Sequence, residues 1–99
     1  MDSFVALVIY PTTADAQSRQ ADNLVRLVGA EVRRMPGFQR GQVLVSEDGA
    51  SLVTLTEWSD RESFDRFRAS DFGRAAVKLT AGLDPKTFWL RPHAVLAPG

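Results

Sequence analysis

Few residues of this chain have side chains that could take part in chemistry, and those few are mostly aromatic or basic. His93 is the only histidine, and histidine is the side-chain type that most readily acts as a base at neutral pH. Trp58 offers an indole N–H donor, and Lys78 or Arg74 offers a positive charge that stabilises an anion. A base, an N–H donor and a cation are groups that proton transfer can use, so Trp58, Lys78 and His93 are the candidate catalytic residues.

Three phenylalanines follow Trp58 closely: Phe64, Phe67 and Phe72. Together with Trp58 they can form the apolar walls of a pocket, or they can be an ordinary core stripe of a helix packed on a sheet. One structural observation separates these alternatives. Rings that fill the space beside Trp58 favour the core, whereas an open cavity that reaches Lys78 or His93 favours an enzyme.

Composition excludes several function classes. Twelve basic and twelve acidic residues cancel, so no positive surplus attracts a nucleic acid or an anionic membrane. Without cysteine and with one histidine, a metal site is not expected, and no glycine-rich motif indicates a bound cofactor. No apolar run approaches the roughly 20 residues of a membrane helix. The N-terminus is typical of a strand rather than a signal peptide, so we expect a cytoplasmic protein.

Apolar periodicity predicts four strands and two helical regions. The strands cover residues 4–10, 38–46, 52–58 and 86–96, and the helical regions cover 15–34 and about 60–79, with a break near 70–71. Side-chain caps are expected from Thr12 or Thr13, from Ser59 and from Asp71. The first helix has one apolar stripe, made of Ala21, Leu24, Val25, Val28, Val32 and Met35.

This order, β-α-β-β-α-β, predicts one α+β domain over residues 1–99 with a ferredoxin-like, four-stranded antiparallel sheet. The helices cover one face of the sheet, and Val53 and Leu55 lie on the other face if Trp58 points to the helices. An uncovered apolar face predicts a homodimer formed face to face. Glu57 then lies at the dimer seam.

Several short motifs carry a family resemblance. They are the apolar first strand, P-G-F at 36–38, the run E-W-S-x-x-x-x-F from Glu57 to Phe64, and S-D-F-x-x-A-A at 70–76. With them the chain resembles, over essentially its whole length, the antibiotic biosynthesis monooxygenase family of the dimeric α+β barrel superfamily. The resemblance implies a homodimer and a pocket between sheet and helices.

One branch of that family comprises cofactor-free oxygenases of polycyclic aromatic polyketides. The resemblance implies that their pocket tryptophan corresponds to Trp58, their asparagine to Thr54 and their tyrosine to Phe64. A basic residue of that branch falls at or near Lys78. This chain therefore keeps the tryptophan and the basic position, and replaces two hydrogen-bonding side chains.

A second branch of the family degrades haem and looks similar around Trp58. Its haem-ligating histidine falls at Val77 and its first-strand asparagine falls near Ile9, and both are absent here. Haem degradation is therefore not expected.

The leading hypothesis is oxidation of a small, flat, polyketide-like or quinol-like aromatic by dioxygen, without metal, flavin or haem. The predicted contacts with the substrate come from Thr54, Trp58, Phe64, Phe67, Phe72 and Arg74. Two other functions stay open on the same scaffold. One is a non-catalytic domain that binds a small ligand or a partner, and the other is a non-oxidative enzyme such as a polyketide cyclase.

Overall fold

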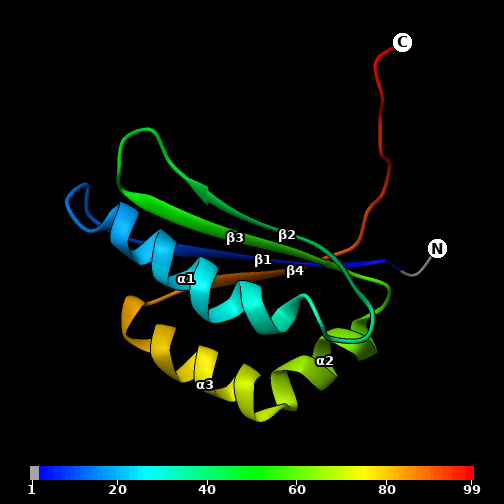
Figure 1. Cartoon of the computed structure of the whole chain (residues 1–99). Coiled ribbons are helices and arrows are strands. Elements are labelled where there is room, and N and C mark those ends of the chain that lie inside the picture. Colours follow the sequence, from blue (N-terminus) through cyan, green and yellow to red (C-terminus); the bar gives the residue numbers. More distant parts are fainter. Residues whose placement is uncertain (1–2) are drawn as a thin grey trace.

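A computed structural model describes residues 3–99, except for the side chains of Leu27, Val28 and Leu79. Its elements, in chain order, are β1 (Phe4–Pro11), α1 (Gln17–Val32), β2 (Phe38–Val45), β3 (Ser51–Trp58), α2 (Arg61–Ala69), α3 (Asp71–Thr80), a 3-10 turn η1 (Ala81–Leu83) and β4 (Lys86–Leu90). The predicted order of elements is confirmed, with the break between α2 and α3 where it was expected (Figure 1). None of the helices in the described part is long and apolar enough to cross a membrane.

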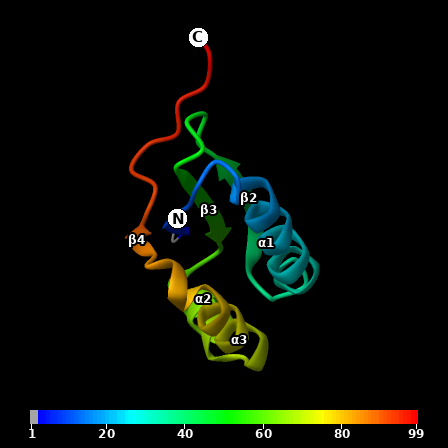
Figure 2. The same ribbon diagram turned by 90° about the vertical axis from the view of Figure 1, so that its left-hand side faces the viewer.

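The four strands form one antiparallel sheet in the order β2-β3-β1-β4. The register places Phe4 opposite Trp58 and Leu7 opposite Leu55. All three helices lie on one side of this sheet, as the two views at right angles show (Figures 1 and 2). The expected α+β, ferredoxin-like fold is confirmed.

The two faces of the sheet differ as the alternation of side chains predicts. On the helix side Trp58 and Leu52 are both fully buried, and Phe4, Ala6 and Tyr10 are buried beside them. On the other side Val53 and Leu55 are only half-buried. The odd-numbered side chains of β1, such as Leu7 and Ile9, also face this uncovered side and are half-buried. In the described part of the protomer, no helix covers this face.

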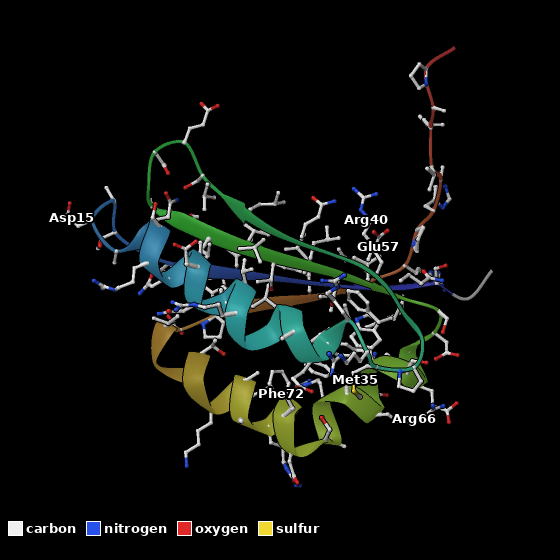
Figure 3. The ribbon with its side chains drawn as sticks, in the orientation of Figure 1. Asp15, Met35, Arg40, Glu57, Arg66 and Phe72 are labelled. Carbon is white, nitrogen blue, oxygen red and sulfur yellow. The ribbon has the colours of Figure 1, made fainter. Side chains whose placement is uncertain are left out.

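The register of the edge strand β2 contains a bulge between Phe38 and Arg40, after which the pairing with β3 shifts. Phe38 pairs with Trp58 on the helix side, whereas Arg40 pairs with Glu57. Figure 3 shows Arg40 and Glu57 on the side of the sheet away from the helices, where their side chains form an ion pair at 3.6 Å.

The helix caps differ from those predicted. α2 is capped by Asp60 instead of Ser59, and the Asp60 carboxylate accepts from the Ser63 amide at 2.8 Å. α3 is capped by Ser70, not Asp71, because its hydroxyl accepts from the Gly73 amide at 3.0 Å. In both cases the capping residue is the last one with an extended backbone.

The start of α1 has no side-chain cap at all. Neither Thr12 nor Thr13 caps the helix through its hydroxyl as predicted. Instead the Thr13 carbonyl accepts from the Gln17 amide at 2.9 Å, so a backbone turn leads into the helix. The hydroxyl of Thr12 bonds to the side chain of Gln20.

Two other predicted features change in the structure. Within the stripe of α1, Leu24 and Val32 are buried but Val25 is 53% exposed, and the Val28 side chain lies outside the described part. The last strand ends at Leu90 instead of Leu96, shortly before Pro92, which lacks an N–H for the ladder. Residues 91–99 form an exposed segment that leaves the body of the protein (Figure 1).

Gly37 joins the start of β2 to the start of α2. Its φ is 85°, its carbonyl accepts from the Ser59 amide at 2.8 Å, and a Cβ on it would overlap the Ser63 side chain. The position therefore requires glycine for both its backbone conformation and its lack of a side chain.

We predict that Gly37→Ala lowers the free energy of unfolding by about 2 kcal/mol or more, from backbone strain and the clash with Ser63. Urea denaturation measures this. Gly29→Ala is the matched control, because nothing lies within 4 Å of a Cβ there. In helix α1 it should raise stability by about 0.5–1 kcal/mol. Equal changes in the free energy of unfolding for Gly37→Ala and Gly29→Ala would contradict a special requirement for glycine at position 37.

Candidate functional site

The Trp58 indole is enclosed by other aromatic rings. Phe38 and Phe64 meet it edge-on, at centroid distances of 5.4 and 5.7 Å, and Phe67 stacks on it at 5.5 Å. Its N–H donates to the Thr56 hydroxyl at 2.9 Å. Trp58 lines neither of the two cavities described below. The space beside it is filled, which is the outcome that favours a core role for this side chain.

A cavity of about 240 Å³ lies farther along the sheet, under α3, and we call it the α3 cavity. Phe64, Phe67 and Trp89 form its aromatic wall, and small residues of the sheet and of α3 line it as well. Its polar side chains are those of Tyr10, Thr54, Thr56, Arg68, Thr80 and Thr87. Phe64 and Phe67 therefore serve both proposed roles, since they pack on Trp58 and also line a cavity.

Tyr10 and Thr80 are both buried side chains that bring a hydroxyl to the α3 cavity, and the Tyr10 hydroxyl is the more acidic of the two. Burial raises the pKa of the Tyr10 hydroxyl above the ordinary value of 10.0, while hydrogen bonds with the Thr54 and Thr80 side chains act in the opposite direction. The Thr80 hydroxyl also donates to the Ala76 carbonyl at 3.0 Å. Tyr10 is therefore a neutral phenol at physiological pH, held in place by two threonines.

Arg68 is the only charged side chain among the described residues that line the α3 cavity. Its guanidinium lies 5.2 Å from the Trp89 ring centroid and 6.0 Å from that of Phe64. Such cation–π contacts hold the charge beside an aromatic wall. No carboxylate or imidazole stands among the described residues of this lining, so the cavity offers hydrogen bonds and a positive charge without a built-in base.

A second cavity of about 340 Å³ lies between α1 and the strands β2 and β3, and we call it the α1 cavity. Its roof includes Leu24 and Val32 from the helix, and its floor includes Val43 and Thr54 from the sheet. Most of its lining is apolar, and Arg33 contributes its one charged side chain among the described residues.

The structure does not bring the other predicted residues to either cavity. Lys78 and Arg74 are exposed on α3, and Arg74 is paired with Asp71. Phe72 is half-buried and packs against the core around Trp58. His93 lies in the exposed segment after β4. The sequence placed Phe72, Arg74 and Lys78 on the right helix but did not fix which way each one points. The placement of His93 on the last strand was wrong, because β4 ends at Leu90.

Sequence reasoning missed Tyr10 and Arg68. A signal for Tyr10 existed, because the alternation along β1 puts it on the same face as Phe4 and Ala6, beside the strand that carries Thr54. Arg68 follows Phe64 by four residues, which is one helical turn. This spacing puts both residues on one face of α2, but it does not show that the Arg68 guanidinium reaches the cavity.

This arrangement can bind a flat molecule with hydroxyl or carbonyl groups. The aromatic wall supplies stacking, the Tyr10 and threonine hydroxyls supply hydrogen bonds, and the Arg68 guanidinium stabilises negative charge. Within the described part of the chain, no three histidine, aspartate or glutamate side chains lie together in a way that could hold a metal ion.

Comparison with protein families identifies the class to which this fold and site belong. A family model described as antibiotic biosynthesis monooxygenase matches residues 3–79. The chain therefore belongs to the antibiotic biosynthesis monooxygenase family, as its motifs indicated. No curated protein matches the chain in sequence.

Solved structures share the fold at low sequence identity. A point mutant of SnoaB, a cofactor-independent oxygenase from Streptomyces nogalater, is 18% identical with a TM-score of 0.85, covering 99% of this chain and 100% of that one. A monooxygenase from the gene ActVA-Orf6 of Streptomyces coelicolor, in complex with nanaomycin D, is 24% identical with a TM-score of 0.75, covering 99% and 94%. Rv0793 from Mycobacterium tuberculosis is 18% identical with a TM-score of 0.81, covering 97% and 100%.

The burial of Tyr10 leads to a prediction about alkaline pH. Tyr10 is the only tyrosine, so ultraviolet titration of tyrosinate reports on this side chain alone, and its midpoint in the folded protein should lie above 10.0. Because the folded-state pKa is the higher one, the stability it contributes is present below about pH 10 and is lost as pH rises through the folded pKa.

Urea denaturation between about pH 9 and pH 11 measures this loss. In Tyr10→Phe the loss of stability caused by ionisation of Tyr10 disappears. The free energy of unfolding should therefore fall less steeply with pH than in the wild type. A tyrosinate midpoint at or below 10.0 in the folded wild type would contradict the burial of this hydroxyl.

Proposed function

We propose that this protein is a cofactor-independent monooxygenase that oxidises a small, flat, quinol-like or anthrone-like aromatic with dioxygen in the α3 cavity. The observation that carries the proposal is the meeting, in one cavity, of an aromatic wall, the neutral Tyr10 phenol and the Arg68 cation. Family membership supports the same reaction type. The cofactor-independent oxygenase among the structural neighbours offers a parallel at the level of the fold.

The proposed reaction needs few contributions from the protein. An electron-rich phenol or anthrone must lose a proton, and its anion then transfers electrons to dioxygen. At a ring CH₂ group, one oxygen atom becomes the new carbonyl and the other leaves as water with the two hydrogens, so the substrate supplies all the electrons. Arg68 stabilises the substrate anion and so lowers the pKa of the phenol or anthrone. Tyr10 donates a hydrogen bond to a carbonyl of the substrate.

The absence of a carboxylate or imidazole among the described lining residues favours a second candidate. In that case the domain binds a small aromatic ligand without oxidising it. The two candidates share the binding step and differ in turnover, so one assay separates them.

That assay is oxygen uptake with a panel of anthrones and quinols. We expect Arg68→Gln to lower kcat/KM by about 100-fold, the usual loss for a group that stabilises a developing anion. Arg66→Gln is the matched control, since Arg66 is exposed and pairs with Glu62 at 3.3 Å. Oxygen uptake that does not depend on substrate, or that is equal in the wild type, Arg68→Gln and Arg66→Gln, would defeat the oxygenase proposal. Binding of the aromatic without oxygen uptake would favour the second candidate.

The roles of Trp58, Lys78 and His93 remain predictions, and the same assay tests them. Trp58→Phe keeps a ring in the cluster but removes the N–H that donates to Thr56. Lys78→Gln and His93→Ala remove exposed groups that touch neither cavity of the protomer. A loss of activity in His93→Ala would indicate that a base from the segment after β4 reaches the substrate.

We also propose that the protein is a homodimer through the uncovered sheet face, as the sequence predicted. Leu44 and Phe88 are 44% and 46% exposed there, and Val53 and Leu55 lie between them on the central strand β3. An apolar face of this kind is typical of a partner site. The Arg40–Glu57 pair at one end of the same face gives polar contacts at the edge of the seam.

For the dimer, we predict that Leu55→Glu yields monomer or insoluble protein, because a carboxylate cannot be buried without a partner. Sedimentation velocity measures the change. Ala30→Glu adds the same charge on the exposed side of α1 and should leave the sedimentation profile as in the wild type. An unchanged sedimentation profile for Leu55→Glu would contradict the placement of the dimer interface on this sheet face.

A further inference from the structure

The α1 and α3 cavities adjoin each other. Three residues line both of them: Leu24, Thr54 and Thr56. The two threonines follow each other on one face of β3, so they form a continuous floor under both cavities. Leu24 comes from α1 on the opposite side, is 4% exposed and packs on Tyr10 and Leu52. One leucine side chain is therefore the shared wall.

The volumes and charges of the two cavities complement each other. The α3 cavity, at about 240 Å³, lies below the roughly 300–1,000 Å³ that is usual for ligand pockets, and the two cavities together lie within that range. Each has one charged side chain among its described lining residues, Arg68 in the α3 cavity and Arg33 in the α1 cavity. No ion pair is seen for Arg33 within the described residues.

We infer that Leu24 sets the length of the ligand by dividing one binding site into two compartments. The inference rests on the proposed function, since the α3 cavity is the compartment in which oxidation takes place. The wild type binds aromatics that are short enough to lie in the α3 cavity alone. A shorter side chain at position 24 joins the compartments, so that a longer flat aromatic acid lies across both with its carboxylate at Arg33.

The test is calorimetric titration of the whole chain with two probes, 2-naphthol and anthraquinone-2-carboxylate. We expect Leu24→Ala to raise the affinity for the three-ring acid relative to 2-naphthol by about tenfold or more, the range seen when an apolar pocket gains room. Leu83→Ala is the matched control: Leu83 packs against the same core cluster but lines neither cavity. In that variant the ratio of affinities should stay at the wild-type value.

Adding Arg33→Gln to Leu24→Ala should abolish the preference for the acid over anthraquinone-2-carboxamide. Leu24→Val, a smaller truncation, gives the same direction of change if Leu24→Ala does not fold. An unchanged ratio in the folded variant, an equal rise in Leu83→Ala, or an acid preference that survives loss of Arg33 overturns the inference. If the wild type binds neither probe, the proposed function fails as well; if it binds 2-naphthol but the ratio does not change, only the role of Leu24 fails.

Discussion

The burial of the Trp58 indole is the constraint on which the rest of the site depends. A buried indole needs both apolar neighbours and a partner for its N–H. Phe38, Phe64 and Phe67 supply the first, and Thr56 on the same strand face supplies the second. This cluster fills the space between α2 and the end of β3. Farther along the sheet the lining includes the small residues Ala6, Gly73 and Ala76, and there the α3 cavity is open.

The sequence was sufficient for the arrangement of the sheet because strand alternation leaves only two possibilities for each face. Once Trp58 points to the helices, Leu52 must do the same and Val53 and Leu55 must point away. The aromatic wall of Phe64 and Phe67 follows from helical spacing in a similar way. Here the two alternative interpretations of the phenylalanines were not exclusive, since one face of a ring can pack on Trp58 while another edge meets a cavity.

The charged residues of the site could not be predicted with the same rules. Lys78, Arg74 and Arg68 are all exposed and lie on α2 and α3, and charge alone does not tell which of them lines a cavity. Arg68 does so because the rings of Phe64 and Trp89 hold its guanidinium. Such a contact joins a helix to a strand about twenty residues later in the chain, so local periodicity contains no trace of it.

The bulge in β2 has a consequence for how copies of this protein meet. An edge strand with unpaired backbone groups can add a strand from another molecule, and repeated addition leads to fibres. In β2 the ladder is interrupted between Phe38 and Arg40, and the opposite edge, β4, has only five residues. Both borders are thus poor templates for open-ended growth. The proposed pairing through the broad face would close after two copies instead of propagating.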